Sequence, residues 1–212
     1  TNLLLKSLAE TLYMLSISAI IAALIGIPLG ILLVVTEKHG ILSCPVLNKP
    51  LAFIINLIRS IPFIILMVAI IPFTRLVAGT SIGTTAAIVP LTIAAIPYTA
   101  RMVETSIREI PFGLIEAAES MGASPLQIIW KVLIPEALPS IIESLTVVIV
   151  SLIGASAMAG TIGGGGLGDL AIRYGYQRFQ ADVMIATIIV LVIIVQLIQF
   201  IGSNMAKKAD KR

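Results

Sequence analysis

Long runs of apolar residues with few charges recur along this chain and set its organisation. Five of them approach the roughly 20 residues that a helix needs to cross the hydrocarbon core of a bilayer, at about 11–36, 51–72, 84–100, 138–162 and 183–203. The runs are continuous and lack the two-residue alternation of strands in a membrane barrel. They predict an all-α membrane protein with five transmembrane helices, forming one domain over residues 1–212.

Prolines and glycines interrupt three of these runs. In lipid, such breaks are tolerated where neighbouring helices or a water-lined path satisfy the freed backbone groups. A bundle around a pathway and ordinary kinks in packed helices explain each of them equally well. The residues are Gly26, Pro28 and Gly30 in the first run, Pro62 in the second, and Pro90 and Pro97 in the third.

The segment 105–137, between the third and fourth runs, is polar enough to lie outside the lipid and carries clear turn signals. Pro111 suits the first turn of a helix, where its missing N–H has no partner to lose. Gly122 suits a left-handed C-terminal cap. Ser124, followed by Pro125 and Gln127, predicts a capping box at the start of a second helix.

The second short helix should run from Pro125 to about Leu133 and end at Pro135, so that the segment forms a helical elbow. Ala117 and Gly122 present little bulk, and Glu116 and Glu119 add carboxylates. Such a surface could receive a partner protein. The residues alone equally allow a passive connector resting on the membrane surface.

Composition agrees with the membrane assignment, because 58% of the residues are hydrophobic and only 12% are charged. Lys and Arg favour the cytoplasmic side of a membrane. All but four of the fourteen basic residues fall on the side of the elbow, which places the N-terminus outside and the C-terminus inside. These ten are Lys38, Lys49, Arg59, Arg101, Arg108, Lys131, Lys207, Lys208, Lys211 and Arg212; the others are Lys6, Arg75, Arg173 and Arg178.

Candidate chemistry within the chain is sparse. One cysteine, Cys44, and one histidine, His39, are too few for a transition-metal site or a Cys/His nucleophile. Basic residues form no dense run with aromatic residues between them, which argues against nucleic-acid binding. The "GGGGLG" stretch, 163–168, follows a membrane span rather than a strand, so a turn or gate region outside the cytoplasm is favoured over dinucleotide binding.

The elbow also carries a family resemblance. Glu116-Ala117-Ala118, Gly122 and the run from Val132 to Pro135 resemble the EAA motif of ABC importer permeases, with Val132 and Ile134 as conservative departures. Longer stretches, such as "AAIVPLTIAAIPYTARMVE" and "GGGGLGDLAIRYGY", resemble the permease subunits of methionine ABC importers.

The resemblance implies a non-catalytic permease of the bacterial inner membrane, whose elbow is the coupling helix. It implies a homodimer with two ATPase subunits, which bind ATP and Mg²⁺, and an extracytoplasmic binding protein that delivers methionine as the D or L isomer. The chain itself would hold no cofactor or metal. The docking residues implied by the motif and its turn are Glu116, Ala117, Ala118, Gly122, Ala123, Ser124 and Pro125.

The fourth apolar run holds the candidate substrate pathway. Ser151, Ser156 and Met158 lie among small residues, which either pack tightly or line a pore. We expect Met158 to narrow the pathway, and Arg59 and Glu143 either to snorkel towards the membrane boundary or to pair with each other. Alternatives to a methionine permease are a permease for another amino acid, a transporter or channel that needs no ATPase, and a membrane scaffold.

Overall fold

The computed structural model describes residues 2–38 and 40–210, so Thr1, His39, Lys211 and Arg212 lie outside the described residues. The regular elements in the described part are helices. They are α1 (Asn2–Val35), α2 (Pro45–Ser60), α3 (Phe63–Ala69), α4 (Ile71–Ala78), α5 (Thr84–Arg108), α6 (Phe112–Ser120), α7 (Pro125–Ile128), α8 (Ile134–Thr161), α9 (Gly166–Leu170) and α10 (Ala181–Ala209), with π-helical segments at Ile129–Leu133 (η1) and Ala171–Tyr176 (η2).

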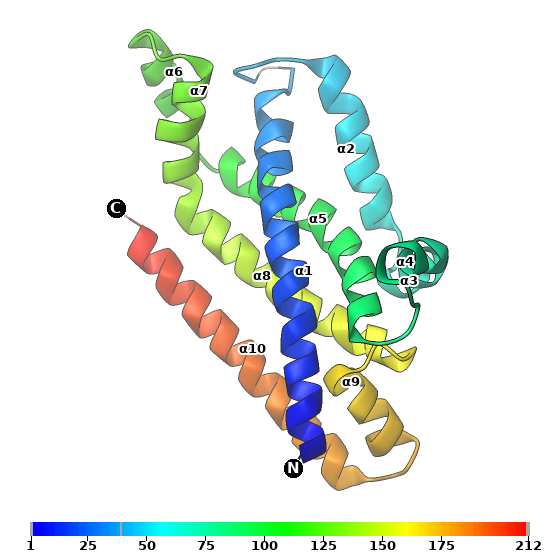
Figure 1. Ribbon diagram of the computed structural model, residues 1–212. Coiled ribbons are helices and arrows are strands. Elements are labelled where there is room, and N and C mark those ends of the chain that lie inside the picture. Colours follow the sequence, from blue (N-terminus) through cyan, green and yellow to red (C-terminus); the bar gives the residue numbers. More distant parts are fainter. Residues whose placement is uncertain (1, 39, 211–212) are drawn as a thin grey trace.

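Four long helices, α1, α5, α8 and α10, form an elongated bundle (Figure 1). The first turns of α1 lie at one end, with α9 and the start of α10, and the elbow formed by α6 and α7 lies at the other. In the described chain, four helical segments are long and apolar enough to cross a membrane, or up to five if the bent pair α2 and α3 counts as one span. The all-helical membrane architecture expected from the apolar runs is therefore confirmed.

Close contact between α1 and α5 organises the bundle, and two glycines make it possible. A Cβ atom at Gly26 would lie 2.6 Å from the Cβ of Thr99, and one at Gly30 would lie 2.7 Å from the Cβ of Val103. The Gly-x-x-x-Gly spacing thus lets the two helices approach, as in many membrane helix pairs. These glycines, and Pro28 between them, lie within one continuous helix.

The second apolar run, 51–72, is not one straight helix, and its break falls at Pro62, one of the interruptions noted in the sequence. It divides into α2 and α3, which are bent by 102° relative to each other. Pro62 explains the break, because a residue before proline disfavours the helical conformation, and Ile61 adopts φ −87° and ψ 122°. By contrast, Pro90 and Pro97 lie inside the continuous helix α5.

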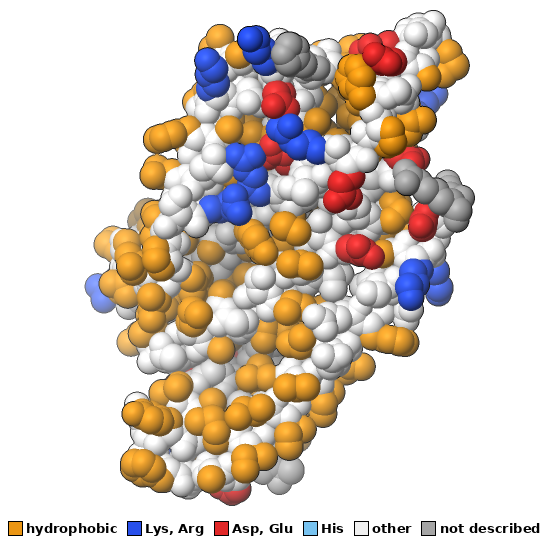
Figure 2. All heavy atoms as spheres, turned by 180° about the vertical axis from the view of Figure 1, so that it is seen from behind, with side chains coloured by type: hydrophobic (Ala, Val, Ile, Leu, Met, Phe, Trp, Pro, Cys, Tyr) orange, Lys and Arg blue, Asp and Glu red, His pale blue; other side chains and the backbone are white. Residues whose placement is uncertain are grey.

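The surface separates into an apolar body and a charged end. Figure 2 shows that Lys, Arg, Asp and Glu side chains gather towards the end that carries the elbow, while hydrophobic side chains cover much of the remainder. Large apolar residues on α10, among them Ile188, Val192 and Phe200, are more than half exposed. In water this surface would be costly, whereas in lipid it needs no protein partner.

Candidate functional site: a capped helical elbow and an open membrane cavity

The elbow begins with α6, whose start differs from the prediction in one respect. Pro111 is the N-cap residue, not the first residue of the helix, which begins at Phe112. The ψ of Pro111 is 129°, an extended value that turns the chain away from α5. Its carbonyl accepts the N–H of Leu114 at 3.0 Å. Proline suits this position because its fixed φ fits the turn as well as the helix.

A Schellman motif ends α6 and fixes the angle of the elbow. Gly122 has φ +78°, as predicted, and its N–H donates to the carbonyl of Glu119 at 2.9 Å. The N–H of Ala123 donates to the carbonyl of Ala118 at 3.1 Å. Together these bonds satisfy two carbonyls that the end of the helix would leave unpaired.

The capping box predicted at the start of α7 is confirmed. The Ser124 hydroxyl oxygen accepts the N–H of Gln127 at 3.4 Å, and the Gln127 carbonyl oxygen accepts the N–H of Ser124 at 2.9 Å. Pro125 begins the helix, where no N–H is required. Only two residues, Gly122 and Ala123, separate the end cap of α6 from the start cap of α7, so the turn between the helices is closely defined.

Pro135 does not end the second helix, contrary to the prediction. The chain passes from α7 through the π-helical segment Ile129–Leu133 directly into α8. Within that segment the N–H of Ile134 donates to the carbonyl of Ile129, five residues earlier. The wider turn accommodates a proline that lacks its own N–H. The elbow is therefore continuous with the transmembrane helix that follows it.

Burial divides the elbow into an inner and an outer face. Ala118, Ile128 and Leu133 are at most 4% exposed and pack in one cluster with Val103 and Ile107 of α5. Large apolar side chains cover the outer face, where Met121, Trp130 and Leu126 are 82%, 67% and 64% exposed. Among the motif residues, Glu116, Ala117, Gly122 and Ser124 are exposed, Ala123 and Pro125 are half-buried, and Ala118 faces the protein interior.

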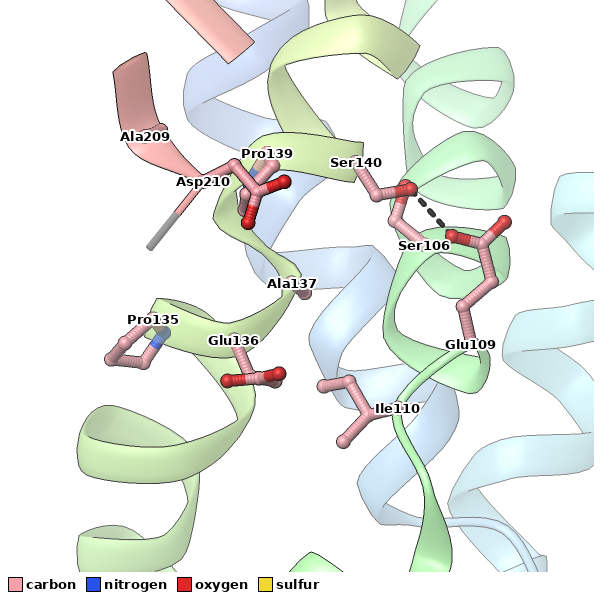
Figure 3. A pocket seen from close by; sticks show the side chains of 10 residues that line it. All are labelled: Ser106, Glu109, Ile110, Pro135, Glu136, Ala137, Pro139, Ser140, Ala209 and Asp210. Atoms are coloured by element: carbon pink, nitrogen blue, oxygen red, sulfur yellow. Dashed lines mark hydrogen bonds between the residues drawn. The ribbon is translucent and has the colours of Figure 1, made fainter. Parts of the chain in front are cut away.

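Hydrogen bonds join the base of the elbow to the bundle. The Ser140 hydroxyl donates to Glu109 at 2.8 Å, and the hydroxyl oxygens of Ser106 and Ser144 lie 2.8 Å apart. Beside these contacts is a hollow of about 290 Å³ between α5, α8 and the end of α10 (Figure 3). The elbow is thus supported by both α5 and α8 where it leaves the bundle.

An ionic network centred on the buried carboxylate of Glu104, which the sequence analysis missed, lies near the elbow. The Glu104 side chain, 6% exposed, contacts Arg101 at 2.6 Å and Arg108 at 2.9 Å. Arg108 also contacts Glu37 at 2.9 Å, and Arg101 donates to Asn56 at 2.9 Å. The sequence does hold one sign of this network, because Arg101, Glu104 and Arg108 are spaced to lie on one helical face. The network ties the loop after α1, and α2, to α5.

The candidate pathway residues of α8 have different surroundings. Ser151 is exposed and lines a cavity of about 270 Å³ between α2, α3, α5 and α8. Ser156 is buried and donates to the carbonyl of Ile153 at 2.8 Å, whereas Met158 is 49% exposed. Arg59 does not pair with Glu143; its guanidinium lies over the Tyr98 ring at 6.0 Å. The structure therefore brings Ser151 to the same cavity as Arg59 and leaves Ser156 and Met158 apart from it.

The glycine-rich turn is held by the start of the chain, a contact that the sequence analysis also missed. Glu10 accepts the N–H of Gly166 at 2.9 Å, and the Thr11 hydroxyl accepts the N–H of Leu167 at 2.8 Å. The described residues contain no group of three or more His, Cys, Asp or Glu side chains that could hold a metal ion.

These features define a membrane-spanning helical protein with a capped elbow and a cavity between α2, α3, α5 and α8, the architecture of a permease. Residues 26–212 match the family described as "Binding-protein-dependent transport system inner membrane component". The chain belongs to that family, which confirms the expected resemblance to importer permeases.

Individual relatives cover almost the whole chain. The "Probable D-methionine transport system permease protein MetI" of Vibrio cholerae is 54% identical over 212 residues, which are 100% of this chain and 94% of the relative. A protein of the same description from Pasteurella multocida is 50% identical over 97% of this chain and 95% of its own. The fold matches a chain of the "MetNI methionine ABC transporter" in an inward-facing conformation, with TM-score 0.96 and 48% identity, covering 100% of this chain and 98% of the other.

Proposed function

We propose that this protein is the permease subunit of an ABC importer that carries methionine, as the D or L isomer, into the cytoplasm. The substrate assignment rests on the 54% identity, over the full chain, to a relative described as a probable D-methionine transport system permease protein. On this proposal α2 and α3 together form the second of five spans. The N-terminus lies outside and the elbow inside, in agreement with the gathering of charges at the elbow end (Figure 2).

The observation that carries the coupling role is the outer face of the elbow. Met121, Leu126 and Trp130 are large, apolar and mostly exposed, although they lie at the charged end rather than on the apolar body. Two caps hold this surface in one shape. A protruding apolar patch on a rigid support fits the groove of a protein partner. The proposed partner is the ATPase subunit, which binds ATP and Mg²⁺.

The continuity of α7 with α8 supplies a mechanical route in this proposal. Movement of the docked elbow would turn α8, which lines the cavity through Ser151 and Leu152. One elbow in each chain requires two permease copies to engage two ATPase copies, with a two-fold axis between them. An extracytoplasmic binding protein would deliver methionine at the opposite end.

Uptake by proteoliposomes tests the proposal. Methionine should accumulate only when the permease, the ATPase and ATP are all present, together with the binding protein. Uptake without the ATPase would support a secondary transporter or channel instead, and the absence of any uptake would support a scaffold. Competition by a panel of amino acids would show whether methionine is the preferred substrate.

A bulky substitution tests the docking surface. Ala117→Trp should reduce substrate-stimulated ATP hydrolysis on the order of tenfold or more, because the exposed methyl group leaves room for a partner but the indole does not. Ala181→Trp, at the exposed start of α10, is the matched control and should keep normal activity. Equal activity of the two variants would contradict docking at Ala117.

A further inference from the structure

The cavity at the break between α2 and α3 combines an apolar lining with a few polar groups. Its apolar walls include Phe63, Leu66 and Leu152, and its polar side chains are Arg59, Tyr98 and Ser151. The volume of about 270 Å³ is close to the lower end of the roughly 300–1,000 Å³ typical of small-molecule sites. The size and lining therefore suit a small ligand that is mostly apolar.

In the described chain, the polar side chains of the cavity make no hydrogen bond or ion pair with one another or with their neighbours. Among the described residues, Arg59 has no carboxylate partner, and its guanidinium lies over the Tyr98 ring at 6.0 Å. The hydroxyl groups of Tyr98 and Ser151 make no hydrogen bond with the described residues. Unpaired polar groups that converge on an apolar cavity are typical of ligand sites.

The position of Arg59 makes its lack of a partner significant. Arg59 is fourteen residues after Pro45, which begins α2, so it lies about 21 Å along the helix at 1.5 Å per residue. If α2 and α3 form one span, as proposed above, Arg59 lies near the middle of that segment, where a cation is costly in a bilayer and usually serves a substrate or ion pathway. Arg59 is also exposed, so its guanidinium is accessible from the cavity mouth.

We propose that this cavity binds a single amino acid with an apolar side chain, whose carboxylate pairs with Arg59. The ligand side chain, such as the thioether of methionine, lies against Phe63, Leu66 and Leu152. The hydroxyl oxygens of Ser151 and Tyr98 accept hydrogen bonds from the ligand ammonium group. A guanidinium pairs well with a carboxylate, and each charge offsets the desolvation of the other. This inference rests on the proposed function, because it makes the cavity a station on the transport pathway.

Protection of an introduced cysteine tests the site locally. Ala155 lines the cavity but carries no polar group, so Ala155→Cys preserves Arg59, Tyr98 and Ser151. In the assembled permease–ATPase complex without ATP, methionine should slow alkylation of this cysteine by a small thiol reagent several-fold. Cys44, which is exposed outside the cavity, serves as an internal control whose alkylation should not change. Methioninamide, which lacks the carboxylate, should give little protection.

The role of Arg59 is tested by combining substitutions. Arg59→Gln should raise the methionine concentration needed for protection by about tenfold or more, as expected for loss of a charged hydrogen bond, and should leave the weak effect of methioninamide unchanged. Arg178→Gln is the matched control, because Arg178 also lies over a tyrosine ring, Tyr174, at 4.4 Å but does not line the cavity. This control should keep full protection by methionine.

Several results would overturn the proposal. They are equal protection by methionine and methioninamide with Arg59 intact, full protection in Arg59→Gln, and an Ala155→Cys side chain that never reacts. If the Arg59→Gln variant does not assemble with the ATPase, the comparison of methionine with methioninamide in the protein with Arg59 intact still tests the site. Because the assay requires neither ATP nor transport, protection can fail while ATP-dependent uptake persists, which would reject the site and leave the proposed function standing.

Discussion

The elbow at one end of the molecule and the glycine-rich turn at the other each contain a glycine with positive φ, but the two glycines are required for different reasons. At the elbow, Gly122 has φ +78°, and a Cβ atom there would meet nothing within 4 Å. At the glycine-rich turn, Gly166 has φ +77°, and a Cβ atom would lie 2.6 Å from the Thr11 hydroxyl. Gly122 is therefore needed only for its backbone conformation, whereas Gly166 is needed for conformation and for space.

The elbow is thus a surface that a partner protein can reach, whereas the glycine-rich turn is a closely packed contact that the fold requires. The elbow is held by its own local hydrogen bonds and exposes its outer face. The glycine-rich turn is held by Glu10 and Thr11, 156 residues away in sequence, and packs against α1 and α8. Damage at the elbow should therefore stay local, while damage at the turn should spread through the bundle.

The largest effect is expected at Gly168. A Cβ atom there would overlap the backbone of Ala157 in α8, so Gly168→Ala should destabilise the protein by about 3 kcal/mol. Gly154→Ala, also within the membrane body, is the control, because a Cβ atom there meets nothing within 4 Å. Thermal unfolding in detergent should show a lower melting temperature for the first variant only. Equal stability would mean that the turn is not a tightly packed closure.

An intermediate effect is expected at Thr11. Thr11→Val preserves the side-chain shape but removes the acceptor for the buried N–H of Leu167, at a cost of about 1–3 kcal/mol. Hydrogen exchange at the amide of Leu167 should accelerate, and the melting temperature should fall. Thr11→Ser, which retains the hydroxyl group, should stay closer to the original protein. The same exchange rate in all three proteins would argue against this bond as a support of the turn.

The smallest effect on global stability is expected at Ser124. Ser124→Ala removes the acceptor of the capping box and should weaken the start of α7 by about 1 kcal/mol. Hydrogen exchange should accelerate at Gln127, while the exchange of Leu167 and the melting temperature should hardly change. Ser120→Ala, at an exposed position of α6 outside the capping box, is the control. A general loss of protection across the bundle would contradict a locally stabilised elbow.

Sequence reasoning succeeded where one short segment contains all the groups of an interaction. The Ser124 capping box and the left-handed Gly122 follow from residues within a few positions of one another. The same reasoning was wrong at Pro135, because the effect of a proline depends on the surrounding backbone. Pro62 separates two helices, whereas Pro135 lies in a helix that a π-helical turn has widened.

Contacts between distant segments were beyond the sequence pattern. The bonds from Glu10 and Thr11 to the glycine-rich turn connect residues with no common periodicity. The Glu104 network was in part visible, because Arg101 and Arg108 lie one turn to either side, but Glu37 and Asn56 join it only in the folded chain.

The sequence by itself determined that this is a helical membrane protein with a capped elbow, because apolar runs and local hydrogen bonds need no distant partners. Tertiary structure alone decided that a Cβ atom would have free space at Gly122 but not at Gly166, since the space around Gly166 depends on the packing of α1 and α8. It also brought Arg59, Tyr98 and Ser151 from three helices to one cavity. The bend at Pro62 follows from a local proline, but the packing of α2, α5 and α8 that brings the three side chains together joins segments far apart in the chain.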